Sequence, residues 1–165
     1  MMSATEPHIL AGNILRIWLG PQIFLANHTH VAQLLPVAHL RDMPDERGQP
    51  MQQIGLADLL QHAPVPTHHA LLIATRRRTV ALLVTAVDLW AQPSDVAPVI
   101  QPLPPVLRHA LTHAWITGIL IADGQPLQLL NLRQIAQDAL KQAAQGEREQ
   151  RGQPINRSDD LVSRN

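Results

Sequence analysis

The sequence predicts a mainly β protein with one packed C-terminal helix. Short apolar runs separated by turn residues recur along the chain, and two of them, ALLIA and VALLV, are continuous enough to form strands buried on both faces. Asp123-Gly124 separates WITGILIA from PLQLLNL, and this dipeptide is typical of a two-residue hairpin turn. After that hairpin, apolar residues recur with the period of a helix.

The N-terminal half predicts short strands around one helical turn. ILRIWL alternates between apolar and polar residues, Gly20-Pro21 interrupts it, and QIFLANHTHVAQLL completes a hairpin. The polar stretch LRDMPDERGQP predicts a loop. MQQIG then predicts a short strand, and GLADLLQH predicts a helical turn that ends before Pro64.

The C-terminal half begins with two strands, ALLIA and VALLVTAVDLW, on either side of three consecutive arginines. PSDVAPVIQPLPP holds five prolines and predicts an extended segment that cannot be a central strand throughout. LRHALTHA predicts a short helix before the hairpin at Asp123-Gly124.

The last predicted element is an amphipathic helix that begins with Asn131 as N-cap and stops at Gly146. Its apolar face consists of Leu132, Ile135, Ala136, Ala139, Leu140 and Ala143. The polar segment that follows this helix has almost no apolar residues and predicts a disordered tail. We therefore expect an ordered domain over residues 8–142 and a polar, disordered tail over residues 143–165.

Composition excludes several classes of protein. The 165-residue chain carries 13 Lys and Arg against 13 Asp and Glu, so no net field attracts nucleic acid or an anionic membrane. The absence of cysteine excludes disulfides, thiolate metal sites and a cysteine nucleophile. The longest apolar run contains Asp88 and is shorter than the about 20 residues that span a bilayer. With no signal-peptide pattern, the sequence predicts a soluble cytoplasmic protein.

The sequence offers no catalytic constellation. None of its four serines lies on a strand-to-helix elbow with flanking glycines, and its eight glycines form no phosphate-binding loop. The carboxylate pairs Asp45-Glu46 and Asp159-Asp160 fall in a predicted loop and in the tail, where solvation explains them. We predict a protein that is not an enzyme, with no catalytic residue and no cofactor.

Nine histidines raise the question of a metal site. His109 and His113 share a helix face, but Ala110 stands where a zincin has its catalytic glutamate, and no third ligand is near in the sequence. The other close pairs are His28 with His30 and His68 with His69. We predict no metal site.

The three arginines, Arg76–Arg78, allow two readings. They lie where a hairpin must turn, and charged side chains suit an exposed tip. Nucleic-acid binding calls for further basic residues on the same face and interleaved aromatic rings, and aromatic residues make up only 2% of the chain. A hairpin tip is therefore favoured, and a small β-barrel nucleic-acid-binding protein is the alternative.

The order of the motifs resembles the CheW-like domain, the adaptor that couples bacterial chemoreceptors to a histidine kinase. Five segments of this chain resemble short sequence motifs of the family and occur in the family's order: Val31–Leu34, Arg47-Gly48 with Ile54–Leu60, Leu82–Val87, Ile116–Ile119 and Leu129–Leu132. The resemblance covers residues 8–142.

The resemblance implies a fold and a function. The fold is two small five-stranded β-barrels that share a hydrophobic core, with a C-terminal helix. The function is that of a scaffold that binds the kinase's regulatory domain and the receptor's helical tip through docking surfaces, edge strands and an apolar groove. Arg47 and Gly48 match the polar part of the family motif and are the first candidates for partner binding, together with Gln33 and Arg41.

The chain also departs from the family's pattern. Gln33, Thr85 and Asn131 stand where the family often has an acidic residue, and the strand that leads into Arg47 is shortened to HLRDMPDERG. These departures predict a divergent adaptor, in which the neutral residues mean either altered partners or lost coupling.

Overall fold

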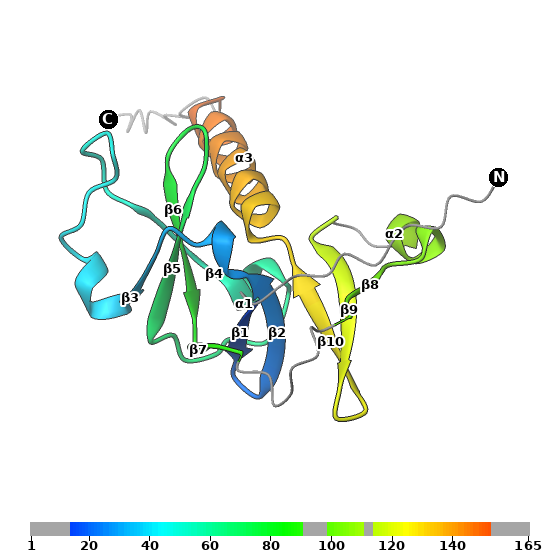
Figure 1. Cartoon of the computed structure of the whole chain (residues 1–165). Helices are drawn as coiled ribbons and strands as arrows, with labels where there is room; N and C mark the ends of the chain where they lie inside the picture. The colour runs from blue at the N-terminus through cyan, green and yellow to red at the C-terminus, as the bar shows by residue number, and fades with distance from the viewer. Residues whose placement is uncertain (1–13, 91–98, 111–113, 153–165) are drawn as a thin grey trace, which may run out of the picture.

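The computed structural model describes residues 14–90, 99–110 and 114–152, which form two β-sheets and a long C-terminal helix (Figure 1). In hydrogen-bonded order, the six-stranded sheet consists of β7 (Ala86–Leu89), β1 (Ile14–Leu19), β2 (Gln22–Asn27), β10 (Gln125–Leu130), β9 (Ile116–Ala122) and β8 (Gln101–Pro102). The four-stranded sheet consists of β3 (Gln33–Pro36), β5 (His69–Ala74), β6 (Thr79–Val84) and β4 (Gln52–Gly55). The helical elements are η1 (His28–His30), η2 (Val37–Leu40), α1 (Leu56–Leu59), α2 (Pro105–Ala110) and α3 (Leu132–Gly152).

The predicted mainly β class with a C-terminal helix is confirmed, as are the three predicted hairpins, β1–β2, β5–β6 and β9–β10. The strands divide as six and four between the sheets, whereas the resemblance implied five and five. The reason is that β6 and β7 are one extended segment that changes sheet at Thr85. The Thr85 N–H donates to the carbonyl of Trp18 at 3.0 Å, and this bond directs the chain from β6 onto β1.

The predicted hairpin turn at Asp123-Gly124 is confirmed by its backbone. Asp123 has φ 49° and Gly124 has φ 75°, the two positive values of the type I′ turn that matches the twist of the flanking strands. On its other side, β9 pairs with the short strand β8, and Gly118 of β9 lies opposite Pro102 of β8.

Gly118 is predicted to tolerate no side chain. A Cβ there would lie 2.5 Å from Cγ2 of the buried Ile100 and 3.0 Å from the carbonyl oxygen of Gln101. We expect Gly118→Ala to lower the free energy of unfolding by about 1–3 kcal/mol because it overpacks this contact. Urea unfolding checks the value. Gly146→Ala is the matched control: Gly146 lies in α3 with open space around it, and there alanine is expected to stabilise by about 0.5–1 kcal/mol.

One hydrophobic core joins the two sheets. Its members come from β1, β2 and β10 of one sheet, from β5 and β6 of the other, from α1 and α3, and from the residue before β9: Leu15, Ile17, Leu19, Phe24, Ala26, Leu56, Ala57, Leu71, Ile73, Val80, Leu82, Val84, Trp115, Leu130, Leu132, Ile135 and Ala136. The two sheets are therefore packed against each other through one shared core. Strands β5 and β6 are buried along most of their length, as their continuous apolar runs predict.

Helix α3 begins as predicted and ends later than predicted. The Asn131 Oδ1 accepts a hydrogen bond from the Gln134 N–H at 3.2 Å, which confirms the N-cap. The predicted stop at Gly146 is wrong, because α3 continues to Gly152. Gln, Glu, Ala and Arg are good helix formers, and one glycine costs only about 1 kcal/mol relative to alanine. Residues 153–165, the rest of the predicted tail, lie outside the described residues.

The cap at Asn131 is testable by substitution. We expect Asn131→Ala to cost about 1 kcal/mol in the free energy of unfolding, because the Gln134 N–H loses its acceptor. Asn131→Asp restores an acceptor of the same length and adds a negative charge at the N-terminus of α3, so its stability is expected to match the parent or exceed it. Thermal unfolding of the two variants side by side checks this; equal losses in both would show that the cap does not stabilise the helix.

The remaining helical elements differ in small ways from prediction. The turn α1 lies where GLADLLQH predicts it. Helix α2 begins at Pro105, two residues before the predicted start, because proline suits the first helical position, and residues 111–113 lie outside the described part of the chain. Within the described residues, no helix combines the length and apolar character that crossing a membrane requires.

Candidate docking surfaces

The three arginines lie at the turn of the β5–β6 hairpin, as predicted, and a threonine fixes that turn. The Thr75 hydroxyl donates to the carbonyl of Arg78 at 2.7 Å and accepts from the backbone N–H groups of Arg77 and Arg78, both at 3.2 Å. A short polar side chain that bonds to its own turn in this way holds the backbone in one conformation. The positions of the arginines are therefore set by local hydrogen bonds.

Arg78 differs from its two neighbours because its side chain contacts a loop that is distant in the sequence. Its Nε lies 3.3 Å from Oδ2 of Asp45, without the geometry of a hydrogen bond, and its Nη2 donates to the carbonyl of Pro50 at 2.6 Å. The Asp45 side chain is fully buried and that of Arg78 is 24% exposed. Arg78 thus clamps the loop between Pro44 and Pro50 onto the four-stranded sheet.

Asp45 organises that loop from inside. Its Oδ1 accepts from the N–H of Gln49 at 2.9 Å and from the N–H of Arg47 at 3.0 Å. The Gln49 N–H, together with the Arg47 N–H and the Arg78 guanidinium, holds the pKa of Asp45 below its usual value. Asp45 therefore stays ionised as the anchor of the loop.

The Asp45-Glu46 pair lies in a loop, as predicted, but the explanation of both carboxylates by solvation is wrong. Solvation does not explain Asp45, which is only 6% exposed, and the Glu46 carboxylate accepts a hydrogen bond from the Thr79 hydroxyl, which lowers the pKa of Glu46. The string Asp-Glu-Arg-Gly carries the signal that was missed, since aspartate at the first and glycine at the fourth position are typical of a turn bonded to the aspartate.

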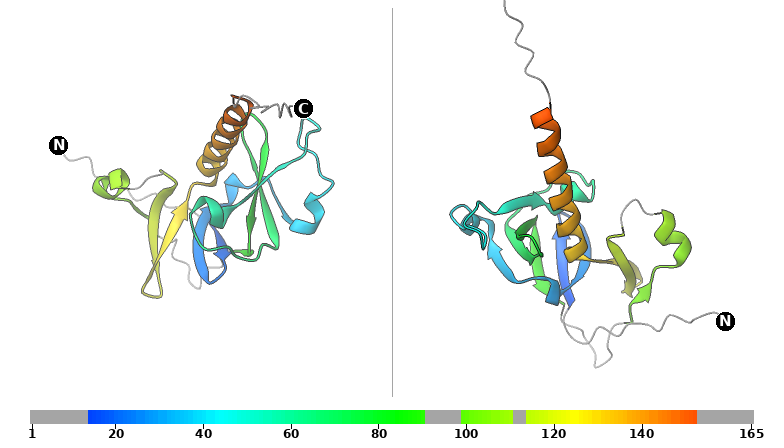
Figure 2. Two further views of the ribbon diagram at one scale, coloured as in Figure 1. Left: turned by 180° about the vertical axis from the view of Figure 1, so that it is seen from behind. Right: turned by 90° about the horizontal axis from the view of Figure 1, so that it is seen from above.

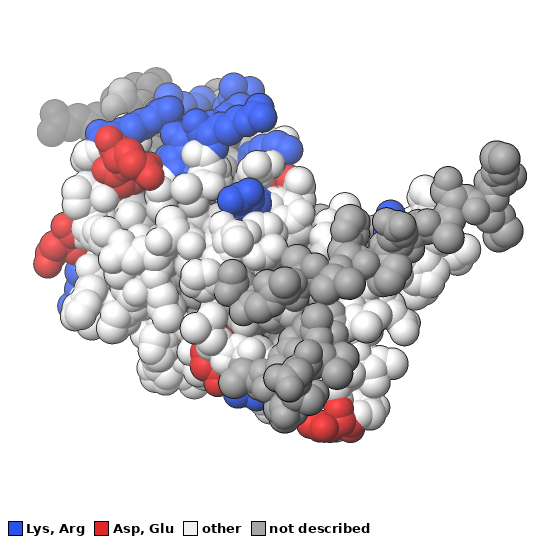
Figure 3. Space-filling view, in the orientation of Figure 1, with Lys and Arg blue, Asp and Glu red and all other residues white. Residues whose placement is uncertain are grey.

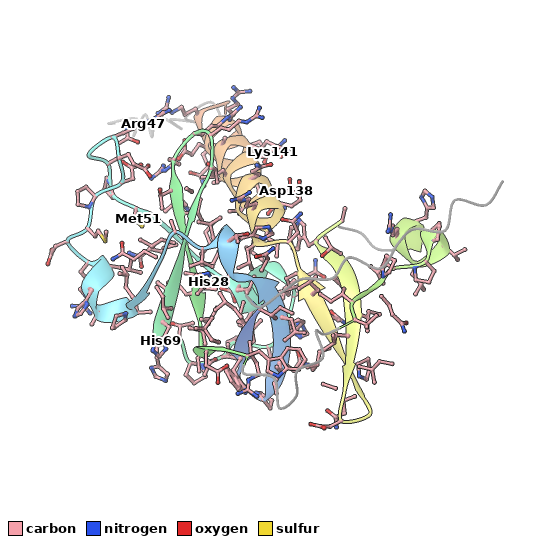
Figure 4. All side chains as sticks on the ribbon, in the orientation of Figure 1. His28, Arg47, Met51, His69, Asp138 and Lys141 are labelled. Atoms are coloured by element: carbon pink, nitrogen blue, oxygen red, sulfur yellow. The ribbon has the colours of Figure 1, made fainter. Side chains whose placement is uncertain are left out.

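Of the predicted partner-binding residues, Arg47 and Gly48 lie next to each other at the turn of the loop between Pro44 and Pro50. Both are exposed, and Arg47 lies at the same end of the molecule as the β5–β6 turn (Figure 4). Gly48 has φ +70°, a conformation that favours glycine, and its N–H donates to the carbonyl of Asp45 at 2.9 Å. The loop thus presents the Arg47 side chain from a fixed backbone.

Gln33 and Arg41 lie elsewhere on the same sheet. Gln33 is exposed on the edge strand β3, opposite Leu72. Arg41 follows η2 and lines a shallow hollow. The other residues that line this hollow are Pro36, Val37, Ala38, Gln53, Thr67 and His68. Among the described residues, no hydrogen bond or ion pair joins any two of the four candidates. Between η2 and β4 the chain forms only an isolated bridge at Pro44 and Pro50, in keeping with the shortened strand.

Two of the departures from the family's acidic positions have local structural roles. The Thr85 hydroxyl donates to the carbonyl of Pro66 at 2.7 Å and accepts from the N–H of Gly20 at 2.9 Å. A carboxylate has no proton to donate, so it could not replace Thr85 in both bonds. Asn131 is the cap of α3, a role that an aspartate would also fill.

An apolar hollow of about 270 Å³ lies where η1 leaves the six-stranded sheet for β3. It is lined by Asn27, His30, Ile100, Pro102, Thr117, Leu129, Leu130 and Asn131. His30 is half-buried there, its Nδ1 has no hydrogen-bond partner, and burial together with the charge of Arg133 lowers its pKa. None of these lining residues belongs to the four-stranded sheet, so this hollow is not a groove between the two sheets.

The histidines do not gather into a metal centre within the described part of the chain, where no three His, Asp or Glu side chains lie close enough to hold an ion. His113 lies outside the described residues, so the pair that it forms with His109 in the sequence has no structural account.

Comparison with known proteins supports one fold. No family model matches the chain, and no curated protein matches it. A solved structure does: the scaffolding protein CheW from Thermoanaerobacter tengcongensis is 17% identical, with a TM-score of 0.53 over 74% of this chain and 90% of that chain. This chain has a CheW-like fold. The resemblance predicted from the motif order is confirmed at the level of the fold, and the low identity agrees with a divergent CheW-like chain.

Proposed function

We propose that this CheW-like chain is a non-catalytic adaptor of the cytoplasm that couples a chemoreceptor to a histidine kinase. The observation that carries the proposal is the shared fold with a scaffolding protein, which extends over nine-tenths of that protein. The sequence adds that no nucleophile, phosphate loop or catalytic pair is recognisable, so docking surfaces are the natural route to function.

The proposed docking surface for the kinase domain is the edge of the four-stranded sheet. Strand β3 is an edge strand, and such an edge can add a partner's strand through its unpaired backbone groups. Gln33 and Leu34 on β3 are exposed, Leu34 by 46%. Arg47 and Arg41 add two exposed charges that a partner of opposite charge can bind.

Co-purification tests this function. The full chain, the regulatory domain of the kinase and the helical tip of the receptor encoded with it are mixed, and the affinity of each pair is measured. We expect both to bind, and we expect Arg47→Ala with Arg41→Ala to weaken kinase binding about tenfold, or about 1.4 kcal/mol. Arg108→Ala, an exposed arginine on α2, is the control and is expected to change nothing. Binding to neither protein would contradict the proposal.

A further inference from the structure

A basic cradle lies between the β5–β6 turn and α3, two elements that are far apart in the sequence. It is a hollow of about 370 Å³ lined by Thr75, Arg76, Arg77, Gln137, Leu140 and Lys141. Figure 1 and the left view of Figure 2 show α3 running beside the hairpin tip, and Figure 3 shows Lys and Arg side chains gathered at this end of the molecule. The fold thus adds a lysine to the arginines, which the sequence alone does not reveal.

The charge of this cradle is largely uncompensated. Arg76 and Arg77 are exposed, and neither guanidinium has an acidic partner among the described residues. Lys141 lies 3.4 Å from Oδ1 of Asp138. That carboxylate also accepts from the side chains of Trp115 and Gln134, so it is shared among three donors. The cradle keeps at least two free positive charges, with Lys141 partly neutralised.

The cradle is built before any ligand arrives. One wall is the turn that the Thr75 hydroxyl fixes. The other wall is α3, which is anchored through Leu132, Ile135 and Ala136 in the core that joins both sheets. Binding to a preformed site avoids the loss of conformational entropy that a flexible loop would incur.

We propose that the basic cradle binds a carboxylate-rich segment of a protein partner. Arginine presents a planar fork of donors that matches a carboxylate, and two adjacent arginines with a lysine opposite suit a run of Asp or Glu side chains. Leu140 and Gln137 on the same wall supply an apolar contact and an amide for the segment's backbone. The cradle is separate from the residues assigned above to the kinase surface, so this inference goes beyond the proposed function.

Two features favour an acidic protein segment over nucleic acid. No aromatic ring lines the cradle, so bases have no stacking platform. The chain as a whole is neutral, with 13 basic and 13 acidic residues, so it has no net positive charge to attract a phosphate backbone.

The test is fluorescence anisotropy with labelled octaglutamate and, in a parallel arm, labelled duplex DNA. We expect octaglutamate to bind the full chain and to bind more weakly as salt rises. Arg76→Gln with Arg77→Gln is expected to weaken binding at least about tenfold, and Lys141→Gln about threefold, because Asp138 already shares its charge. Arg108→Gln on α2 is the matched control and is expected to bind like the parent.

Further arms keep the proposal open to refutation. Arg76→Lys with Arg77→Lys keeps the charge and is expected to retain much of the affinity, and the double glutamine variant is expected to keep the parent's melting temperature because both side chains are exposed. Absence of octaglutamate binding would overturn the proposal. So would an equal loss in Arg108→Gln, or tighter binding to DNA that is abolished by the double variant. Kinase binding that survives in the double variant shows that the cradle and the proposed adaptor surface fail or succeed independently.

Discussion

Replacing Leu71 with alanine is expected to unfold both sheets together at a lower urea concentration. Leu71 is fully buried in β5, in the core that joins the four-stranded to the six-stranded sheet. Loss of a buried leucine removes its transfer free energy and leaves a cavity, so we expect the free energy of unfolding to fall by about 2–5 kcal/mol. Because the core is shared, the change made in one sheet is expected to be measured in the other.

The tryptophans make this measurable. The chain has three, and none lies in the four-stranded sheet: Trp18 is in β1, Trp90 follows β7, and Trp115 precedes β9. Their fluorescence therefore reports on the six-stranded side, whereas far-UV circular dichroism reports on both sheets. Coincident shifts of the two transitions are expected in Leu71→Ala. A fluorescence transition that stays in place would show that the sheets unfold separately. Leu89→Ala, at a position 62% exposed, is the control and is expected to shift neither.

Replacing Arg78 with alanine is the second large effect, and it is expected at the loop between Pro44 and Pro50. The change removes the charge beside the buried Asp45 carboxylate and the donor to the Pro50 carbonyl. A buried carboxylate that loses its partner is strongly destabilised. We expect the backbone amides of Arg47 and Gln49, which Asp45 now holds, to lose their protection against hydrogen exchange and the melting temperature to fall.

The neighbouring arginine supplies the control. Arg76→Ala changes the same type of residue in the same turn, but its side chain is exposed and unpaired among the described residues, so protection of the loop is expected to remain. If both variants lose protection equally, the clamp by Arg78 does not exist.

Acid provides an independent check on the same loop. Folding lowers the pKa of Asp45, so its contribution to stability is complete above the pKa of an unfolded aspartate, about 3.9, and is lost as pH falls through the lower folded value. Protection of the Arg47 and Gln49 amides is therefore expected to persist at neutral pH and to disappear only in strong acid.

Much of the fold was predictable because its signals are local. The two positive φ values at Asp123 and Gly124, the cap by Asn131 and the buried faces of β5 and β6 all follow from neighbouring residues in the chain. The end of α3 was not predictable from Gly146, since a glycine inside a helix costs only about 1 kcal/mol relative to alanine and does not by itself stop the helix. The division of the strands as six and four likewise depends on where one continuous segment changes sheet.

The candidate sites show the same difference between local signals, which the sequence carries, and contacts between distant segments, which it does not. The sequence alone indicates a mainly β chain, three arginines in a hairpin turn and a CheW-like order of motifs, because alternation, turn residues and motif order can be recognised from neighbouring residues. The clamp of Arg78 on a distant loop through Asp45, and the position of Arg76 and Arg77 opposite Lys141 on α3, become visible only in the folded chain. Burial and ion pairing depend on which distant segments pack together, so three identical neighbours acquire two different roles.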